Sequence, residues 1–128
     1  MNDTSIITKA RRIDLCKITS GGIGVLSPIT HVAFGDGGLN ASGNPISPSE
    51  LQTSLMHEIA RYPIDSVTYP VETTARYVVT IPSGDLDGAE ISEAALVDGD
   101  GKLCAIKTMY KKKKDDGVIF SFTFDDEF

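Results

Sequence analysis

The C-terminal half of the sequence carries several short runs in which apolar and polar residues alternate, and this pattern constrains the fold most strongly. In the clearest run, the side chains of Ala75, Tyr77, Val79 and Ile81 share one face. A period of two residues is typical of a β-strand with one buried face. From Val67 onward the sequence therefore predicts a series of antiparallel strands, with further runs at residues 91–97, 102–110 and 118–124.

Residues 98–101, Asp-Gly-Asp-Gly, separate two of these runs. Asp-Gly pairs adopt positive φ readily and are a strong hairpin signal. The same four residues also begin like a calcium loop, but such a loop needs a closing carboxylate at its twelfth position, which is Met109 here. The pattern therefore predicts a hairpin that binds no metal through Asp98.

The last run lies close to the C-terminal end of the sequence and carries large apolar groups on one face. Val118, Phe120, Phe122 and Phe124 alternate with Ile119, Ser121 and Thr123. Four large side chains on one face need a partner surface. A strand at the chain end is expected to lie at a sheet edge, where such groups are either covered by the core or paired with another chain.

The N-terminal half has helical and irregular signals. Residues 4–19 predict a moderately amphipathic helix that stops at Ser20 and Gly21, since glycine accepts a left-handed cap conformation. Residues 29–34 predict a short strand, and residues 40–48 a polar loop.

A second helix is predicted from Ser47 to Tyr62. Ser47, Pro48 and Glu50 resemble a capping box with proline at the first helical position. Proline after Tyr62 ends the helix, because the residue before proline leaves the α region. Residues at steps of four form one apolar stripe that we expect to pack on the C-terminal strands: Leu51, Leu55 and Ile59, with Met56 beside them.

These elements predict an α+β fold in which two helices pack against a mainly antiparallel β-sheet or small β-sandwich. The 128 residues suit a single domain, residues 1–128, and a hydrophobic content of 41% is enough for a packed core.

Net charge, hydropathy and the N-terminal sequence argue against nucleic acid, a membrane span and secretion. The net charge of −6 argues against nucleic acid and anionic membranes, which are bound mainly through clustered Lys and Arg. No apolar run approaches the roughly 20 residues of a membrane span, and the N-terminus is too charged for a signal peptide. We expect a protein made in a reducing cytosol, with Cys16 and Cys104 as buried thiols.

A glycine-rich turn, Gly35-Asp36-Gly37-Gly38, follows the strand at 29–34 and raises the question of a ligand. It is neither a P-loop nor a dinucleotide fingerprint, since both sequence patterns are absent. We expect a sharp turn without bound phosphate, and no metal at Asp36.

The remaining polar residues give no catalytic constellation. His31 and His57 lack partners at metal-ligand spacing, and no nucleophile motif is present. Residues 111–116, Lys-Lys-Lys-Lys-Asp-Asp, are expected to form a solvated hairpin tip. We therefore predict no catalytic, cofactor-binding or metal-binding residues, and no cofactor.

Two stretches of the sequence resemble the N-terminal region of phage tail-collar fibre proteins. One is Ala-Phe-Gly-Asp-Gly at residues 33–37, with Val32 before it. The other, residues 91–106, resembles the family's E-x-G-L-x-D-x-D-G-x-L hairpin, with Ala94 or Ala95 in place of the glycine. Between them, the match continues through Pro48, Leu51, Leu55, Glu58 and Arg61.

The resemblance implies a non-enzymatic role, which is to fix a fibre to the tail baseplate of a phage or prophage particle. It also implies phage tail or baseplate proteins as partners, and a homo-oligomer, with a trimer suspected. Family members continue into a shaft and a receptor-binding tip, whereas this sequence stops at Phe128. A short adaptor, a prophage remnant or a piece of a longer fibre would each explain this, and receptor recognition is not carried over. The alternatives are a small ligand-binding or regulatory domain and an enzyme of unknown type.

Overall fold

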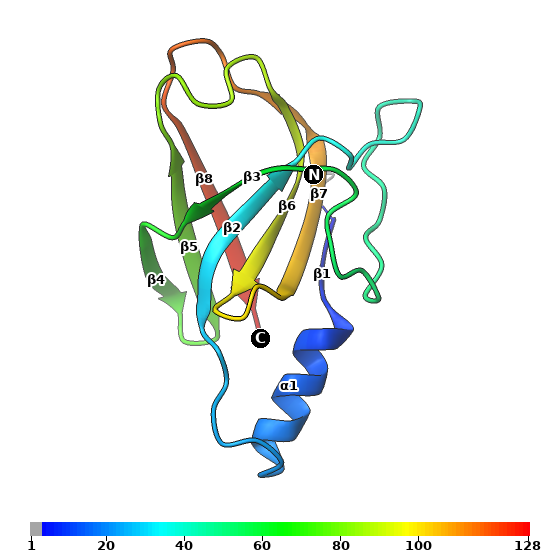
Figure 1. Ribbon diagram of the computed structural model, residues 1–128, viewed down its shortest axis with the longest axis vertical. Helices are drawn as coiled ribbons and strands as arrows, with labels where there is room; N and C mark the ends of the chain where they lie inside the picture. The colour runs from blue at the N-terminus through cyan, green and yellow to red at the C-terminus, as the bar shows by residue number, and fades with distance from the viewer. Residues whose placement is uncertain (1–3) are drawn as a thin grey trace.

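The computed structural model describes residues 4–128 and shows two antiparallel sheets with one short helix (Figure 1). Strands make up 48% of the chain and helix 9%, so the expected α+β fold with two packed helices is wrong. The elements are β1 (Thr4–Ile7), α1 (Lys9–Thr19), β2 (Ile29–Gly35), β3 (Glu58–Pro63), β4 (Ser66–Val71), β5 (Thr74–Ile81), β6 (Glu90–Asp98), β7 (Leu103–Lys113) and β8 (Phe120–Glu127).

The two sheets face each other as a sandwich. The larger sheet has the order β1-β7-β6-β2-β3 and the smaller has the order β4-β5-β8. Phe34 on β2 and Phe122 on β8 meet across the core edge to face, with ring centroids 5.1 Å apart. An edge-to-face aromatic pair stabilises the core beyond the burial of its apolar area, because the interaction depends on the orientation of the rings. The main core therefore joins both sheets, and its buried members are Val32, Phe34, Val79, Ile81, Ile91, Ala94, Leu96, Ala105, Met109, Phe122 and Phe124.

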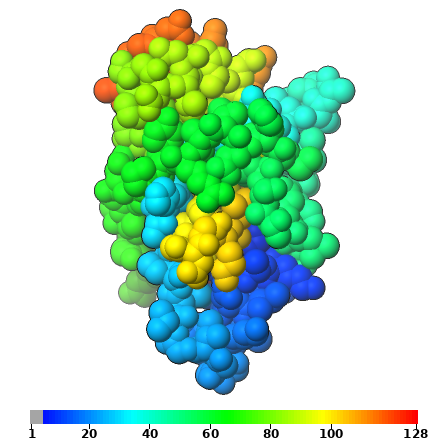
Figure 2. Space-filling model, in the orientation of Figure 1, coloured from blue at the N-terminus to red at the C-terminus, as the bar shows by residue number. Residues whose placement is uncertain are grey.

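The strands predicted in the C-terminal half are present. β6 and β7 are joined by the expected hairpin, with Gly101 at φ 84°, and the hairpin is exposed above α1 in the space-filling view (Figure 2). The final strand β8 is an edge strand as expected. Its residues Phe122 and Phe124 are absorbed by the core, while Val118 and Ile119 precede the strand and are exposed.

The first predicted helix is split into a strand and a shorter helix. Residues 4–7 form β1, which pairs with β7 from Thr4↔Thr108 to Ile7↔Ala105. The buried hydroxyl of Thr8 accepts from the backbone N–H of Arg11 as the N-cap of α1 and donates to the Leu103 carbonyl at 2.7 Å. Thr8 therefore fixes the point at which the chain leaves the sheet and turns into the helix.

α1 ends at the predicted place and projects from one end of the sandwich (Figure 1). Ser20 is the C-cap, and Gly21 follows with φ 83°. None of the helix residues is buried. Its stability therefore depends on its caps and on contacts at its N-terminal end rather than on an apolar face in the core.

The predicted second helix, residues 47–62, is not formed. The chain makes one turn, in which the Ser49 N–H donates to the Gln52 side chain, and then runs irregularly to β3. Residues 58–63 pair instead with β2, from His31↔Pro63 to Gly35↔Glu58. Backbone pairing in the sheet thus overrides a local capping signal.

The expected apolar stripe is also wrong, because its members go to different environments. Leu51 is 67% exposed, and Met56 is 65% exposed. Leu55 is buried on the outer face of the larger sheet, and Ile59 packs against the main core on the inner face. The irregular connection, residues 36–57, therefore covers the outer face of the sheet, where Leu55 joins a second cluster of Ala33, Ala95, Val97, Leu103 and Ile106.

Candidate functional site

The glycine turn after β2 encloses a carboxylate supplied by the protein itself. Glu93 on β6 is fully buried, and its side chain accepts three backbone hydrogen bonds. Gly37 and His57 donate to Oε2 at 2.9 and 2.8 Å, and Met56 donates to Oε1 at 2.9 Å. A buried carboxylate is stable when its oxygens are satisfied in this way. The turn is thus an anion-binding concavity already occupied by Glu93.

The glycines are required by this close approach. A Cβ on Gly35 would lie 2.5 Å from the Glu93 Oε2 atom and from the His57 carbonyl. A Cβ on Gly38 would lie 2.2 Å from the backbone oxygen of Ser92. Real side chains do not tolerate such contacts, so the turn admits only glycine at these positions without a backbone shift. The expectation of a conformational role is supported by this geometry.

The histidines occupy separate surroundings. His57 is exposed, and its Nδ1 atom contacts the Asp36 carboxylate at the rim of the glycine turn. His31 is half-buried on β2, with Nδ1 2.9 Å from the Thr30 hydroxyl. Within residues 4–128, no group of three or more potential metal ligands comes together. The absence of metal at Asp36 stays a prediction.

Asp98 stabilises the hairpin from inside. It is buried, and its Oδ1 atom accepts from the backbone N–H groups of Asp100 and Lys102 at 2.9 and 3.0 Å. Its second oxygen, Oδ2, is buried and has no hydrogen-bond partner among the described residues. The residue therefore closes a turn, as the hairpin interpretation requires. The absence of metal at Asp98 stays a prediction.

The two cysteines differ. Cys104 is buried as expected, and desolvation raises its pKa to about 12. Cys16 lies on α1 and is exposed, so the prediction of a buried thiol is wrong there. The helix stands outside the sandwich, which the sequence pattern could not show.

The lysine run is not a hairpin tip. Its first three residues belong to β7, which lies in the larger sheet, and the chain then crosses to β8 in the smaller sheet. Lys114 is fully buried, and its ammonium donates to Asp87 at 2.9 Å. This hydrogen bond holds the pKa of Asp87 below its ordinary value. The pair ties the crossover to the β5–β6 connection at one end of the sandwich.

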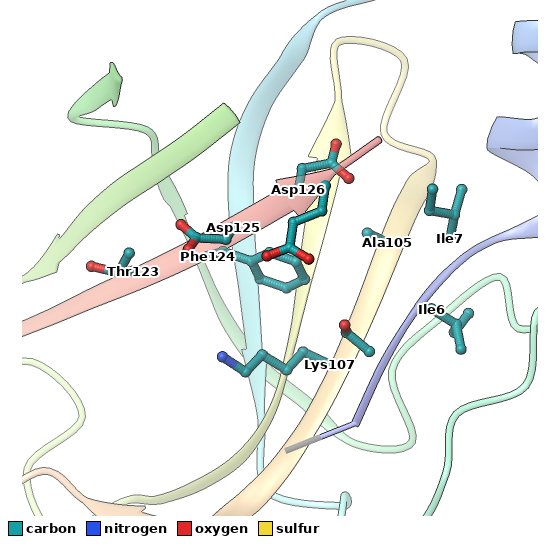
Figure 3. A pocket seen from close by; sticks show the side chains of 10 residues that line it. Ile6, Ile7, Ala105, Lys107, Thr123, Phe124, Asp125 and Asp126 are labelled. Atoms are coloured by element: carbon teal, nitrogen blue, oxygen red, sulfur yellow. The ribbon is translucent and has the colours of Figure 1, made fainter. Parts of the chain in front are cut away.

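A cleft of about 400 Å³ opens where the two sheets end side by side (Figure 3). One wall is β8 and the other is formed by β1 and β7. Lys107 projects from β7 between the walls, with Nζ 5.7 Å from the Phe122 ring centroid. Sequence analysis missed this cleft, although it placed β8 at an edge. Its lining residues are Ser5, Ile6, Ile7, Ala105, Lys107, Thr123, Phe124, Asp125, Asp126 and Glu127.

Asp125 and Asp126 on β8 have opposite environments. Asp125 forms a two-pronged ion pair with Arg76, and this hydrogen bonding lowers its pKa. Asp126 lies on the same, inward face of the strand as Phe124. Desolvation raises the pKa of Asp126, and the positive charge of Arg11 partly opposes this shift. Asp126 is therefore a half-buried carboxylate that borders the cleft.

The α1 helix, the single helix in the part of the chain that the structure describes, is not long and apolar enough to cross a membrane.

The family model for phage tail-collar fibre protein, N-terminal, matches residues 2–125. Neither the curated proteins nor the solved structures give a match.

Proposed function

We propose that this chain, which belongs to the phage tail-collar fibre family and corresponds to its N-terminal region, attaches a fibre to the tail baseplate. The family match over residues 2–125 is the observation that supports this, since it covers almost the whole 128-residue chain. Membership makes the chain a tail component that associates with other phage tail proteins. The baseplate as the point of attachment is our proposal.

The structure is compatible with a rigid attachment module. Its core joins both sheets, and its long β2–β3 connection is fixed by Leu55 and by the hydrogen bonds to Glu93. The cleft between β1 and β8 is open, and charged groups from Lys107 and residues 125–127 share its lining with apolar side chains. Small-molecule sites are usually enclosed and mostly apolar, so the cleft favours attachment over the ligand-binding alternative.

We further propose that the chain acts as a single domain, without catalysis, and is made in the host cytoplasm before assembly into the virion or prophage tail. The family is structural, which supports a non-enzymatic role.

A homo-oligomer, with a trimer as the suspected state, is part of the same proposal. Light scattering across a dilution series of the purified chain tests it, and a monomer at every concentration would remove it.

Deletion of the coding sequence from the phage that carries it tests the attachment role. We expect electron micrographs of the particles to show intact baseplates without this fibre, and the wild-type gene supplied in trans to restore it. Purified chain should also bind isolated baseplates. Deletion particles that keep the fibre in place but fail to adsorb to cells would instead indicate receptor recognition.

A further inference from the structure

We propose that the cleft between β1 and β8 binds an extended, basic segment of another tail protein, which adds to the free edge of β8 as a further antiparallel strand. The proposal rests on the proposed function for the kind of partner, and on the geometry of the cleft for the site and its chemistry. Addition of a strand to a sheet edge is a common mode of peptide recognition, in which the main chain supplies hydrogen bonds.

The first observation is the open edge of β8. This strand pairs with β5 over eight positions, from Thr74↔Glu127 to Ile81↔Phe120, and the smaller sheet ends there. Within the described chain, residues 120–127 make no backbone hydrogen bonds other than those to β5. Half of the strand's backbone groups therefore point away from β5, in the direction in which a further strand would lie.

The second observation is that space exists along this edge. Residues of both orientations on β8 border the cleft: Thr123 and Asp125 from the outward series, and Phe124 and Asp126 from the inward series. A cleft bordered by both series lies against the backbone itself, rather than over one face of the strand. In the described part of the chain, the opposite edge, β1, comprises four residues, so β8 is the longer template there.

The third observation is charge. Asp125, Asp126 and Glu127 are consecutive at one end of the cleft, and Arg76 pairs with Asp125 alone. Among the described residues, none forms a hydrogen bond or ion pair with the Asp126 side chain, which is half-buried. A cation brought beside it would offset the cost of its desolvation. The complementary group on the partner is therefore a Lys or Arg side chain.

Alternation along β8 fixes the order of the partner's residues. Asp126 and Phe124 lie two positions apart on the inward face, next to Ala105 and Ile7. In antiparallel pairing, the segment's N-terminal end lies beside the C-terminal end of β8. The segment thus carries a basic residue followed, two positions later, by an apolar residue that packs on Phe124.

A second copy of this chain fits the cleft less well. Its own lysine-rich segment, Lys111 to Lys113, is already part of β7, where Lys112 and Lys113 pair with Ile91 and Glu90 of β6. Those backbone groups are therefore engaged. A segment from a different protein is the better match.

The test uses the full chain and a capped synthetic hexapeptide, Lys-Thr-Val-Thr-Val-Thr, followed by amide NMR shifts and hydrogen exchange. We expect millimolar peptide to shift and protect the amides of β8, and Asp126→Lys to weaken binding by about tenfold or more. Asp115→Lys, a matched change in an exposed turn outside the cleft, should leave binding unchanged. A peptide with Glu in place of Lys should prefer the Asp126→Lys variant over the wild type.

Several outcomes would overturn the proposal. These are unperturbed β8 amides at millimolar peptide, perturbation confined to the β3 or β4 edge, and a chain that is already dimeric through β8. If the peptide does not bind β8 but the fibre-attachment experiment gives the expected result, only this inference is refuted. Peptide binding on β8, combined with deletion particles that keep their fibres, would instead remove only the proposed function.

Discussion

The carboxylate of Glu93 accepts a 2.9 Å hydrogen bond from the backbone N–H of Gly37, across 56 residues of sequence. This contact joins the middle of β6 to the turn after β2, and the same carboxylate binds the chain where it enters β3. A single buried side chain thus holds both ends of the long β2–β3 connection.

Glu93→Gln should destabilise the protein, because an amide presents one acceptor oxygen where the carboxylate presents two. We expect a loss of about 1–3 kcal/mol in the free energy of unfolding, measured by urea denaturation. Glu72→Gln makes the same chemical change at an exposed turn and should cost less than about 0.5 kcal/mol. Equal losses in the two variants would refute the role assigned to Glu93.

Gly38→Ala should be destabilising by about 1–3 kcal/mol or more, because the new methyl group would meet the Ser92 carbonyl at 2.2 Å. The atoms at this contact belong to the backbone, so the overlap can be relieved only by a shift of the main chain, which costs free energy. Gly24→Ala serves as the control, since a Cβ there meets nothing within 4 Å. Thermal melts of both variants check the prediction, and a melting temperature for Gly38→Ala matching that of Gly24→Ala would show that the turn can relax.

Leu55→Ala should cost about 2–5 kcal/mol, because Leu55 is 4% exposed and fills the outer cluster. Leu51→Ala, four residues earlier in the same connection, removes a side chain that is 67% exposed and should change stability little. Urea titration of the pair measures both. A large loss in Leu51→Ala would restore the apolar stripe expected from the sequence.

Only one thiol should react rapidly in the native protein. Burial raises the pKa of Cys104 to about 12, so it stays protonated near pH 8, whereas Cys16 is exposed. Ellman's reagent should titrate one thiol per native chain, two in denaturant, and none in native Cys16→Ser. Because the folded pKa of Cys104 exceeds its ordinary value of 9.0, its contribution to stability should also fall as the pH rises from 9.0 to about 12.

Asn substitutions at the neighbouring Asp125 and Asp126 should act in opposite directions. The pKa of Asp125 is lowered by Arg76, so its stabilising contribution is present at neutral pH and is lost as the pH falls through and below its ordinary value of 3.8. The pKa of Asp126 is raised by desolvation, so its contribution is favourable only when protonated and is lost as the pH rises. At neutral pH, Asp125→Asn should destabilise and Asp126→Asn stabilise the fold. Both differences should shrink near pH 3, and melts at the two pH values will show whether they do.

The sequence predicted elements whose signals are local. β5 follows an alternating pattern and β6 an apolar run, the hairpin follows from Asp-Gly pairs, and Gly21 marks the helix end. The predicted helix at 47–62 failed because its capping residues make a single turn while its second half pairs with β2. Proline at position 63 does not distinguish the two outcomes, because proline follows helix ends and is also tolerated in edge strands such as β3.

The occupant of the glycine turn could not be predicted. Glu93 lies between Ser92 and an apolar run in β6, and no local pattern indicates that its side chain binds the turn after β2. The cleft could not be predicted either, because it is formed by strands that are far apart in the sequence. Its position depends on β1 and β8 being edge strands of the two sheets on the same side of the sandwich. The sequence pattern at residues 4–7 indicates a helix, because this short strand gains its stability from pairing with β7 rather than from its own pattern.

The uninterrupted pairing of β8 with β5 also has a mechanical meaning. Its hydrogen bonds run perpendicular to the strands, and the pairing covers eight consecutive positions without a bulge. A tensile load applied along β8 therefore acts on all of these bonds at once, in shear, while a load across the strand would open them one after another. For the attachment role proposed above, a load along this strand is therefore the direction in which the β5–β8 pairing resists rupture best.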